Sequence, residues 1–393
     1  MKKRKSFIGG AELTVILCVA FLCIFGCIMV YSASYYSAGK NYGNEYFFLT
    51  KQVLGVVLGA LCLFVCTFID VEKLKKFKWL AVIVSAVLLV LVFVPGVGIE
   101  NYGAKRWIGL GFFTLQPSEI AKFALVFLCA VHLSDNYYRV KKFKTLLAPL
   151  LVGGLFCGLV ILEPNMSITM CIGLVLVIML FLGGISAKHF AFLAVPGVLA
   201  VPALIFMEPY RIKRLMAFLN PWASPQGEGF QLIQSLYGLG AGGLFGVGLF
   251  NSRQKYSFLP FAESDFIFSI IGEELGFVGA AFIMLAFVAL IVALIIIARR
   301  AKTRYSMLLV AGVASVIAVQ TILNIAVVTG SIPPTGLPLP FISAGSTSLI
   351  VFMSAVGLCL NVAKQSKSSN LEMLPVETKK IKKFKTKFAF KNN

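Results

Sequence analysis

Charged side chains, and carboxylates above all, are scarce in this chain. Its 393 residues include only 16 Asp and Glu and two His, and charged residues make up 13% of the total. An ordinary soluble domain carries about 25% charged residues. Here 59% of the residues are hydrophobic and the mean hydropathy is +0.90. The scarcity of charge excludes an ordinary soluble protein and indicates a chain that lies in a lipid bilayer.

Nucleotide- and metal-binding motifs are also missing. The glycine-rich run 238–248 follows no strand and lacks the Lys-Ser/Thr ending of a phosphate-binding loop, so its glycines predict close backbone packing beside a wet cavity. All nine cysteines lie in apolar segments without metal-ligand spacing, and the two histidines lie near expected helix ends. We therefore predict no metal site, although a requirement for a divalent cation, Mg²⁺ or Mn²⁺, stays open.

Apolar runs long enough to cross a bilayer recur along the whole sequence. A spanning helix needs about 20 residues. The runs predict an all-α membrane protein, a polytopic bundle of about ten transmembrane helices. The expected spans are 11–34, 47–69, 78–95, 117–135, 145–162, 166–184, 190–208, 266–298, 307–330 and 343–363.

The net charge of +20 does not indicate a nucleic-acid partner, because the positive charge is confined to alternate loops. Of the 36 Lys and Arg residues, 26 fall at the two ends or in every second loop. The positive-inside rule then places both termini in the cytoplasm. We divide the chain into a basic N-terminus (1–10), a transmembrane domain (11–363) and a basic tail (364–393). The tail is expected to be disordered and to face an anionic leaflet.

One long, charged segment lies on the expected outer side. Residues 209–265 join the seventh and eighth spans, and a connection of this length is commonly functional. Its beginning, 209–225, predicts an amphipathic helix at the membrane surface, with its basic residues on the polar side. The segment ends at Asp265, at the mouth of an apolar helix. Charge is costly there, so Asp265 is a candidate functional residue.

Three further places bring polar groups near the same depth. Glu119 and Lys122 begin the span 117–135, and their i, i+3 spacing allows them to pair. Glu273 and Glu274 lie about a helical turn below the acidic candidate, and at least one of them is expected to have a structural or partner role. The segment 331–348 carries four prolines, which predicts a rigid loop that dips into an outer cavity.

The order of these motifs resembles the SEDS family, which includes FtsW, RodA and SpoVE. The resemblance extends from the first span to residue 363 and is closer to FtsW and SpoVE than to RodA. The matching motifs are "MVYSAS" (29–34), "GAKRWI" (103–108), "QPSEIAK" (116–122), "NPW" (220–222), "SRQKYSFLP" (252–260), "SDFIFSIIGEELG" (264–276) and "PPTGLPLPFISAGSTS" (333–348).

This resemblance implies a ten-span peptidoglycan glycosyltransferase that polymerises lipid II on the outer face of a bacterial membrane. The family's catalytic aspartate, in its Thr-Asp-Phe-Ile-Phe motif, matches Asp265 within Ser264-Asp265-Phe266. Some positions depart from the family pattern. Asn165 stands where an Asp is usual, and Glu263 replaces a common His.

A single carboxylate suits that chemistry. A sugar hydroxyl needs a base, whereas a lipid pyrophosphate leaves without a protonated acid, so paired carboxylates are not required. Inversion at the donor sugar is expected, and cations should stabilise the departing charge. The residues expected to bind substrate are Lys105, Arg106, Gln116, Glu119, Lys122, Arg211, Lys213, Arg214, Trp222, Gln231, Gln234, Asn251, Arg253, Lys255, Ser343 and Ser346.

Two other functions fit a bundle with charges at membrane depth. One is a transporter that flips the lipid-linked precursor, and the other is a scaffold that only recruits division proteins. The resemblance also implies a class B penicillin-binding protein transpeptidase and other cell-division membrane proteins as partners at the septum. The apolar faces of 266–298 and 307–330 are the candidate contacts, although a lipid-facing surface fits them equally well.

Overall fold

A helix lies over each of the ten predicted apolar runs. The computed structural model describes residues 9–101, 104–111, 113–206 and 208–372. The ten helices are α1 (Gly10–Tyr42), α2 (Phe47–Cys66), α4 (Lys78–Leu91), α5 (Pro117–Asp135), α6 (Phe143–Leu162), α7 (Met166–Leu182), α8 (Ala187–Phe206), α11 (Ile267–Arg299), α12 (Arg304–Val328) and α13 (Ser346–Glu372). Seven of them are long and apolar enough to cross a membrane. The helical membrane fold is thus confirmed, and the count of ten spans stays a prediction.

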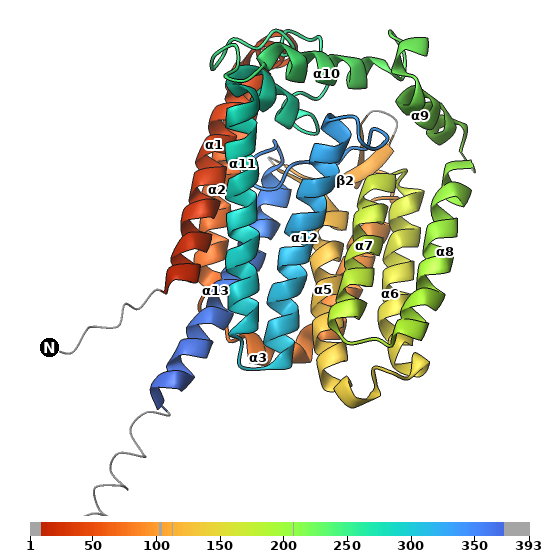
Figure 1. The fold of residues 1–393 in the computed structure, drawn as a ribbon, viewed down its shortest axis with the longest axis vertical. Helices are drawn as coiled ribbons and strands as arrows, with labels where there is room; N and C mark the ends of the chain where they lie inside the picture. Colours follow the sequence, from red (N-terminus) through yellow and green to blue (C-terminus); the bar gives the residue numbers. More distant parts are fainter. Residues whose placement is uncertain (1–8, 102–103, 112, 207, 373–393) are drawn as a thin grey trace, which may run out of the picture.

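The helices run side by side, and shorter elements cover the two ends of the bundle (Figure 1). We call the end that carries Asp265 the outer end, after the orientation expected from the basic loops. There, α9 (Pro209–Leu219) and α10 (Phe230–Gly242), joined through the short η3 (Pro221–Ala223), lie across the bundle (Figure 1). The opposite, inner end carries α3 (Val71–Leu74), η1 (Lys75–Phe77) and η2 (Tyr137–Arg139).

Two helices form the centre of the bundle. Of the residues in the most apolar 18-residue stretch of each helix, 72% are buried in α5 and 67% in α12, but only 17% in α2. Small residues allow this central packing, since α5 carries buried Ala121, Ala124 and Ala130. Glu119 and Lys122 of α5 and Gln320 of α12 are therefore enclosed by protein, which is the condition under which such groups survive at membrane depth.

A small antiparallel sheet at the outer end departs from the all-α prediction. Its strands β1 (Gly98–Asn101), β2 (Ala104–Leu110) and β3 (Phe113–Leu115) pair in the order β1-β2-β3. Ile99 lies opposite Trp107, and Ile108 lies opposite Leu115. Strands of three to seven residues are too short for a clear alternating pattern. The sheet is important for the site because its central strand carries Arg106.

The two ends of the described chain lie at the inner end of the bundle. Glu12 of α1 pairs with Lys367 of α13, at 2.9 Å between Oε1 and Nζ. This contact also corrects the predicted boundary of the tail, because α13 continues past residue 363 to Glu372. The remaining tail (373–393) and residues 1–8 of the N-terminus lie outside the described residues.

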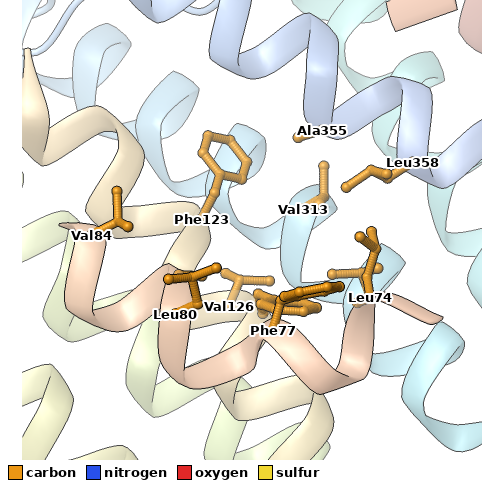
Figure 2. Close-up of a pocket in the computed structure, with 12 residues that line it drawn as sticks. Leu74, Phe77, Leu80, Val84, Phe123, Val126, Val313, Ala355 and Leu358 are labelled. Carbon is orange, nitrogen blue, oxygen red and sulfur yellow. The ribbon is translucent and has the colours of Figure 1, made fainter. Parts of the chain in front are cut away.

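An apolar pocket of about 340 Å³ lies toward the inner end, between α4, α5, α12 and α13 (Figure 2). Phe77 and Leu80 line it on one side, and Val313 and Leu358 on the other. It is distinct from the site of Asp265, which contacts the far end of α12 through Asn324. The cavity expected beside Asp265 stays a prediction.

Candidate active site

Asp265 lies at the outer mouth of α11, two residues before the helix begins. The side-chain amide of Asn324, near the outer end of α12, donates to the backbone oxygen of Asp265 at 2.8 Å and to that of Leu337 at 2.6 Å. One buried amide therefore joins the aspartate's backbone to the proline-rich loop. The position of Asp265 is fixed by two elements besides its own helix.

The segment 331–345 contacts the residues that precede α11, and its predicted dip into an outer cavity stays a prediction. Ser343 accepts a hydrogen bond from the Leu339 amide at 2.7 Å and donates one to the Ser264 carbonyl at 2.6 Å. The Ala344 amide donates to the Glu263 carbonyl at 2.9 Å. Ser343, a predicted substrate-binding residue, thus holds the loop against the backbone next to Asp265.

Gly336 lies so close to the Asp265 carboxylate that a residue with a Cβ would crowd it. A Cβ placed on Gly336 would lie 2.9 Å from Oδ2 of Asp265 and would meet nothing else so close. The atom it meets is the free end of a side chain, which can rotate away. Gly336 therefore leaves room for the carboxylate in its present orientation.

We expect Gly336→Ala to lower kcat by up to about 100-fold, because a displacement of about 1 Å can have that effect on a catalytic group. The melting temperature should change little, since only a side-chain end must shift. Gly345→Ala is the matched control, because its Cβ would lie 3.7 Å from its nearest neighbour, Ser348 Cβ. Equal kcat values for the two variants would contradict the argument.

Two of the predicted cations lie near Asp265. Arg106 comes from β2, and Arg214 comes from α9, where it donates to the Pro334 carbonyl at 3.3 Å. Burial raises the pKa of Asp265 to about 6, the neighbouring charges of Arg106 and Arg214 lower it, and Glu263 raises it further. Burial outweighs the two cations, so the carboxylate is a better base than an exposed aspartate and is still largely ionised at neutral pH.

Glu119 and Lys122 form the predicted pair, at 2.9 Å between Oε1 and Nζ, and both are fully buried. Lys122 also donates to Gln320 of α12, and Ser348 of α13 donates to Glu119 at 3.0 Å. Gln320 in turn donates to the Pro338 carbonyl at 2.9 Å. Both side chains of the pair have polar partners from neighbouring helices, and Gln320 connects the pair to the proline-rich loop. Its contact with substrate stays a prediction.

Lys255 occupies a different environment from the one its predicted role requires. Its ammonium is 3.1 Å from Glu274 Oε1, and both side chains are 0% exposed. Ser32 of α1 donates to the same oxygen at 2.6 Å. Glu273 accepts from the Arg253 amide at 2.9 Å and from the Ser252 hydroxyl. The charge of Lys255 is paired inside the protein, which favours a role in anchoring the loop, and its predicted binding of the departing diphosphate stays a prediction.

The loop can be anchored there because α11 is interrupted at Gly276. This residue has φ 67° and ψ −170° inside the helix, a backbone conformation that glycine adopts at little cost. The amides of Val247 and Gly248 donate to the Glu273 and Glu274 carbonyls at 3.0 Å each, in place of the next helical turn. The predicted close packing of the glycine-rich run is thus confirmed, and Glu273 and Glu274 have the structural role expected of at least one of them.

The other predicted residues lie around the outer end. The predicted amphipathic helix is present as α9, with Ala217 on its buried side, and its place at the membrane surface stays a prediction. The exposed predicted residues are Lys105, Lys213, Trp222, Asn251 and Arg253. The half-buried ones are Gln116, Arg211, Gln231, Gln234 and Ser346. Their part in substrate binding stays a prediction.

Two neighbours of the site were not predicted, although the sequence contains a signal for both. Gln320 and Asn324 are four residues apart in an apolar span, which places two amides on one helix face. Polar groups at that depth are a functional indication of the same kind as the carboxylates. Glu163, which lies beside Arg106, had no such pattern around it.

The described part of the chain contains no cluster of side chains that is typical of a divalent-cation site. No group of three or more His, Cys, Asp or Glu side chains is placed there to hold a metal ion. A requirement for Mg²⁺ or Mn²⁺ stays open.

Comparisons with known proteins identify the family. A model of the cell cycle proteins FtsW, RodA and SpoVE matches residues 12–368. The chain is 40% identical to stage V sporulation protein E of Bacillus subtilis over 91% of its own length and 98% of the relative's. It is 38% identical to a probable peptidoglycan glycosyltransferase FtsW of Trichlorobacter lovleyi, over 96% and 99% of the two chains.

Solved structures show the same fold. One chain from a peptidoglycan synthase complex, described as coordinating polymerization and crosslinking, aligns with a TM-score of 0.75 and 27% identity, covering 90% of this chain and 98% of that one. The rod shape determining protein RodA of Thermus thermophilus aligns with a TM-score of 0.67 and 24% identity, covering 90% and 96%.

Proposed function

This chain belongs to the FtsW, RodA and SpoVE family, and from that premise we propose that it is a peptidoglycan glycosyltransferase that polymerises lipid II. The observation that carries the proposal is the carboxylate of Asp265 at the outer end, flanked by the charges of Arg106 and Arg214. The relatives named as probable peptidoglycan glycosyltransferases support it, since they match more than nine tenths of this chain.

The reaction assigns one role to each of these groups. A hydroxyl of the acceptor sugar attacks the anomeric carbon of the donor, and its proton passes to Asp265. A new glycosidic C–O bond forms as the bond to the lipid diphosphate breaks, with inversion at the donor carbon. The departing diphosphate carries the negative charge that Arg106 and Arg214 are placed to stabilise. One base and two cations are sufficient, because diphosphate leaves without an added proton.

The activity should be lost on the acid side as pH falls through about 6. Asp265 must be ionised to accept a proton, and burial raises its pKa to about 6. An ordinary aspartate, with a pKa of about 4, would place the loss about two units lower. Measuring kcat/KM for lipid II against pH tests this, because its acid limb reports the base of the free enzyme. A limb near pH 4 would contradict the assignment.

The direct test is polymerisation by the purified protein. Lipid II is supplied in detergent or in vesicles, with and without a partner transpeptidase, and glycan strands are resolved by gel electrophoresis. Strands from the wild-type protein support the glycosyltransferase. A transporter would move labelled lipid II across the vesicle membrane without forming strands, and a scaffold would do neither.

We further propose that a class B penicillin-binding protein is the partner, at the division septum of a bacterial membrane. The structural relative from a peptidoglycan synthase complex supports this pairing. On α11, an exposed apolar face provides a surface for a single transmembrane helix, with Phe282 59% and Leu285 64% exposed. Most of α12 is enclosed in the bundle, so α11 is the better of the two predicted contacts. Cytoplasmic termini and a lipid-facing tail remain part of this proposal.

A further inference from the structure

Glu163 is a buried carboxyl group that the mechanism above does not use. It follows the last residue of α6 and precedes Pro164, and it is 0% exposed. Within the described residues, neither of its carboxyl oxygens has a hydrogen-bond partner. An ionised carboxylate is costly to bury in that state. The arrangement therefore favours the neutral, protonated form.

Arg106 is held by the main chain of the same corner. Its Nε donates to the Glu163 carbonyl at 3.2 Å, and its Nη2 donates to the Pro164 carbonyl at 2.5 Å. A guanidinium has five N–H donors, and these two bonds leave others for an anion. The side chain of Glu163 thus lies next to a cation whose position is already fixed.

Arg106 interacts electrostatically with two carboxyl groups, those of Asp265 and Glu163. The charged and titratable groups that face it are Asp265 from the mouth of α11, Arg214 and Tyr210 from α9, and Glu163 itself. Among the residues that the structure describes, Arg106 is the charged group that acts on Glu163, and Glu263 also acts on Asp265. Only one of the carboxyl groups beside Arg106 has to be ionised for the reaction. The charge of the other would compete for the same guanidinium.

We propose that Glu163 is a positioning residue that controls how much of the Arg106 charge reaches the substrate. The neutral carboxyl leaves the guanidinium to Asp265 and the departing diphosphate. The ionised carboxylate attracts the guanidinium and holds its charge at the corner between α6 and α7. This inference rests on the proposed glycosyltransferase function and deepens it, because it adds a residue that acts through Arg106.

The position of Glu163 on the pH scale follows from the same geometry. Burial raises the pKa of Glu163 to about 8, and the neighbouring Arg106 lowers it. The carboxyl is therefore mostly neutral at pH 7 and ionises as pH rises through about 8. The sign is opposite to that of Asp265. Activity should fall on the alkaline side through Glu163 and on the acid side through Asp265.

The test compares complete pH profiles of kcat/KM for lipid II polymerisation, each normalised to its own maximum. Glu163→Gln keeps the shape of the neutral side chain but cannot ionise, so the alkaline limb should move upward by at least about one pH unit or disappear. Glu100→Gln is the matched control, because Glu100 is an exposed carboxyl on β1 of the same sheet. Its profile should follow that of the wild type.

Coinciding alkaline limbs for Glu163→Gln and the wild type would overturn the inference, and so would a folded Glu163→Gln variant without activity at any pH. A second measurement does not depend on activity. The infrared difference spectrum of wild type minus Glu163→Gln should show a protonated carboxyl band at pH 7 that is lost at alkaline pH. Absence of that band would overturn the inference alone, whereas absence of glycan strands from the wild type would overturn the proposed function.

Discussion

Asp265→Asn should abolish polymerisation while leaving the protein folded. The substitution keeps the size of the side chain and removes the base, and a general base contributes about 100- to 10,000-fold to a rate. Burial raises the pKa of this carboxyl, so the ionised side chain is less stable in the folded protein than in the unfolded chain. The neutral amide removes that cost. We therefore expect a melting temperature at pH 7 that is equal to or higher than that of the wild type.

The measurement combines two readouts on the same preparation. Glycan strands are quantified by gel electrophoresis, and thermal unfolding is followed in detergent. Ser264→Ala is a useful control, since the neighbouring hydroxyl is not assigned a chemical step and the Ser343 contact uses the Ser264 backbone. Equal amounts of glycan strands from Asp265→Asn and the wild type would remove the base from the mechanism, whereas no strands from either protein would favour the transporter or the scaffold.

The helical bundle could be predicted because hydropathy alone determines it. Each apolar run of about 20 residues has to satisfy its backbone internally, and a helix does so at any such place in the chain. The three-stranded sheet had no comparable signal, because its pairing depends on which short segments meet at the outer end. The last span was predicted to end at residue 363, but α13 continues to Glu372, and its Lys367 pairs with Glu12 of α1.

The candidate site was predictable only in part, for a related reason. Asp265 and the Glu119–Lys122 pair were found because charge at membrane depth is costly and therefore informative. The cost of burying a charged side chain does not reveal whether that charge binds a substrate or is paired with another group of the protein. That distinction depends on partners far apart in the chain, such as Glu163 beside Arg106 or Asn324 beside Asp265. For Lys255 the structure favours compensation by protein, because its ammonium pairs with buried Glu274.

Lys255→Met tests that distinction by its effect on stability. The variant leaves Glu274 buried without its counter-ion, which typically costs about 3–5 kcal/mol. Adding Glu274→Gln removes the isolated charge and should restore part of the loss. Lys40→Met is the matched control, because Lys40 is exposed in the last turn of α1 and its removal should change stability by less than about 0.5 kcal/mol.

The two possible roles of Lys255 give opposite patterns in these measurements. If Lys255 anchors the loop, Lys255→Met should have a lower melting temperature than the wild type, and the double variant should recover part of that stability. A diphosphate-binding lysine instead raises KM for lipid II with little change in melting temperature, and Glu274→Gln does not compensate. Because Ser32, Ser252 and Lys255 all bond to Glu274, the loss of the ammonium should also loosen the loop that covers the outer end of α1. Protease cleavage within residues 244–262 should then become faster in Lys255→Met than in Lys40→Met.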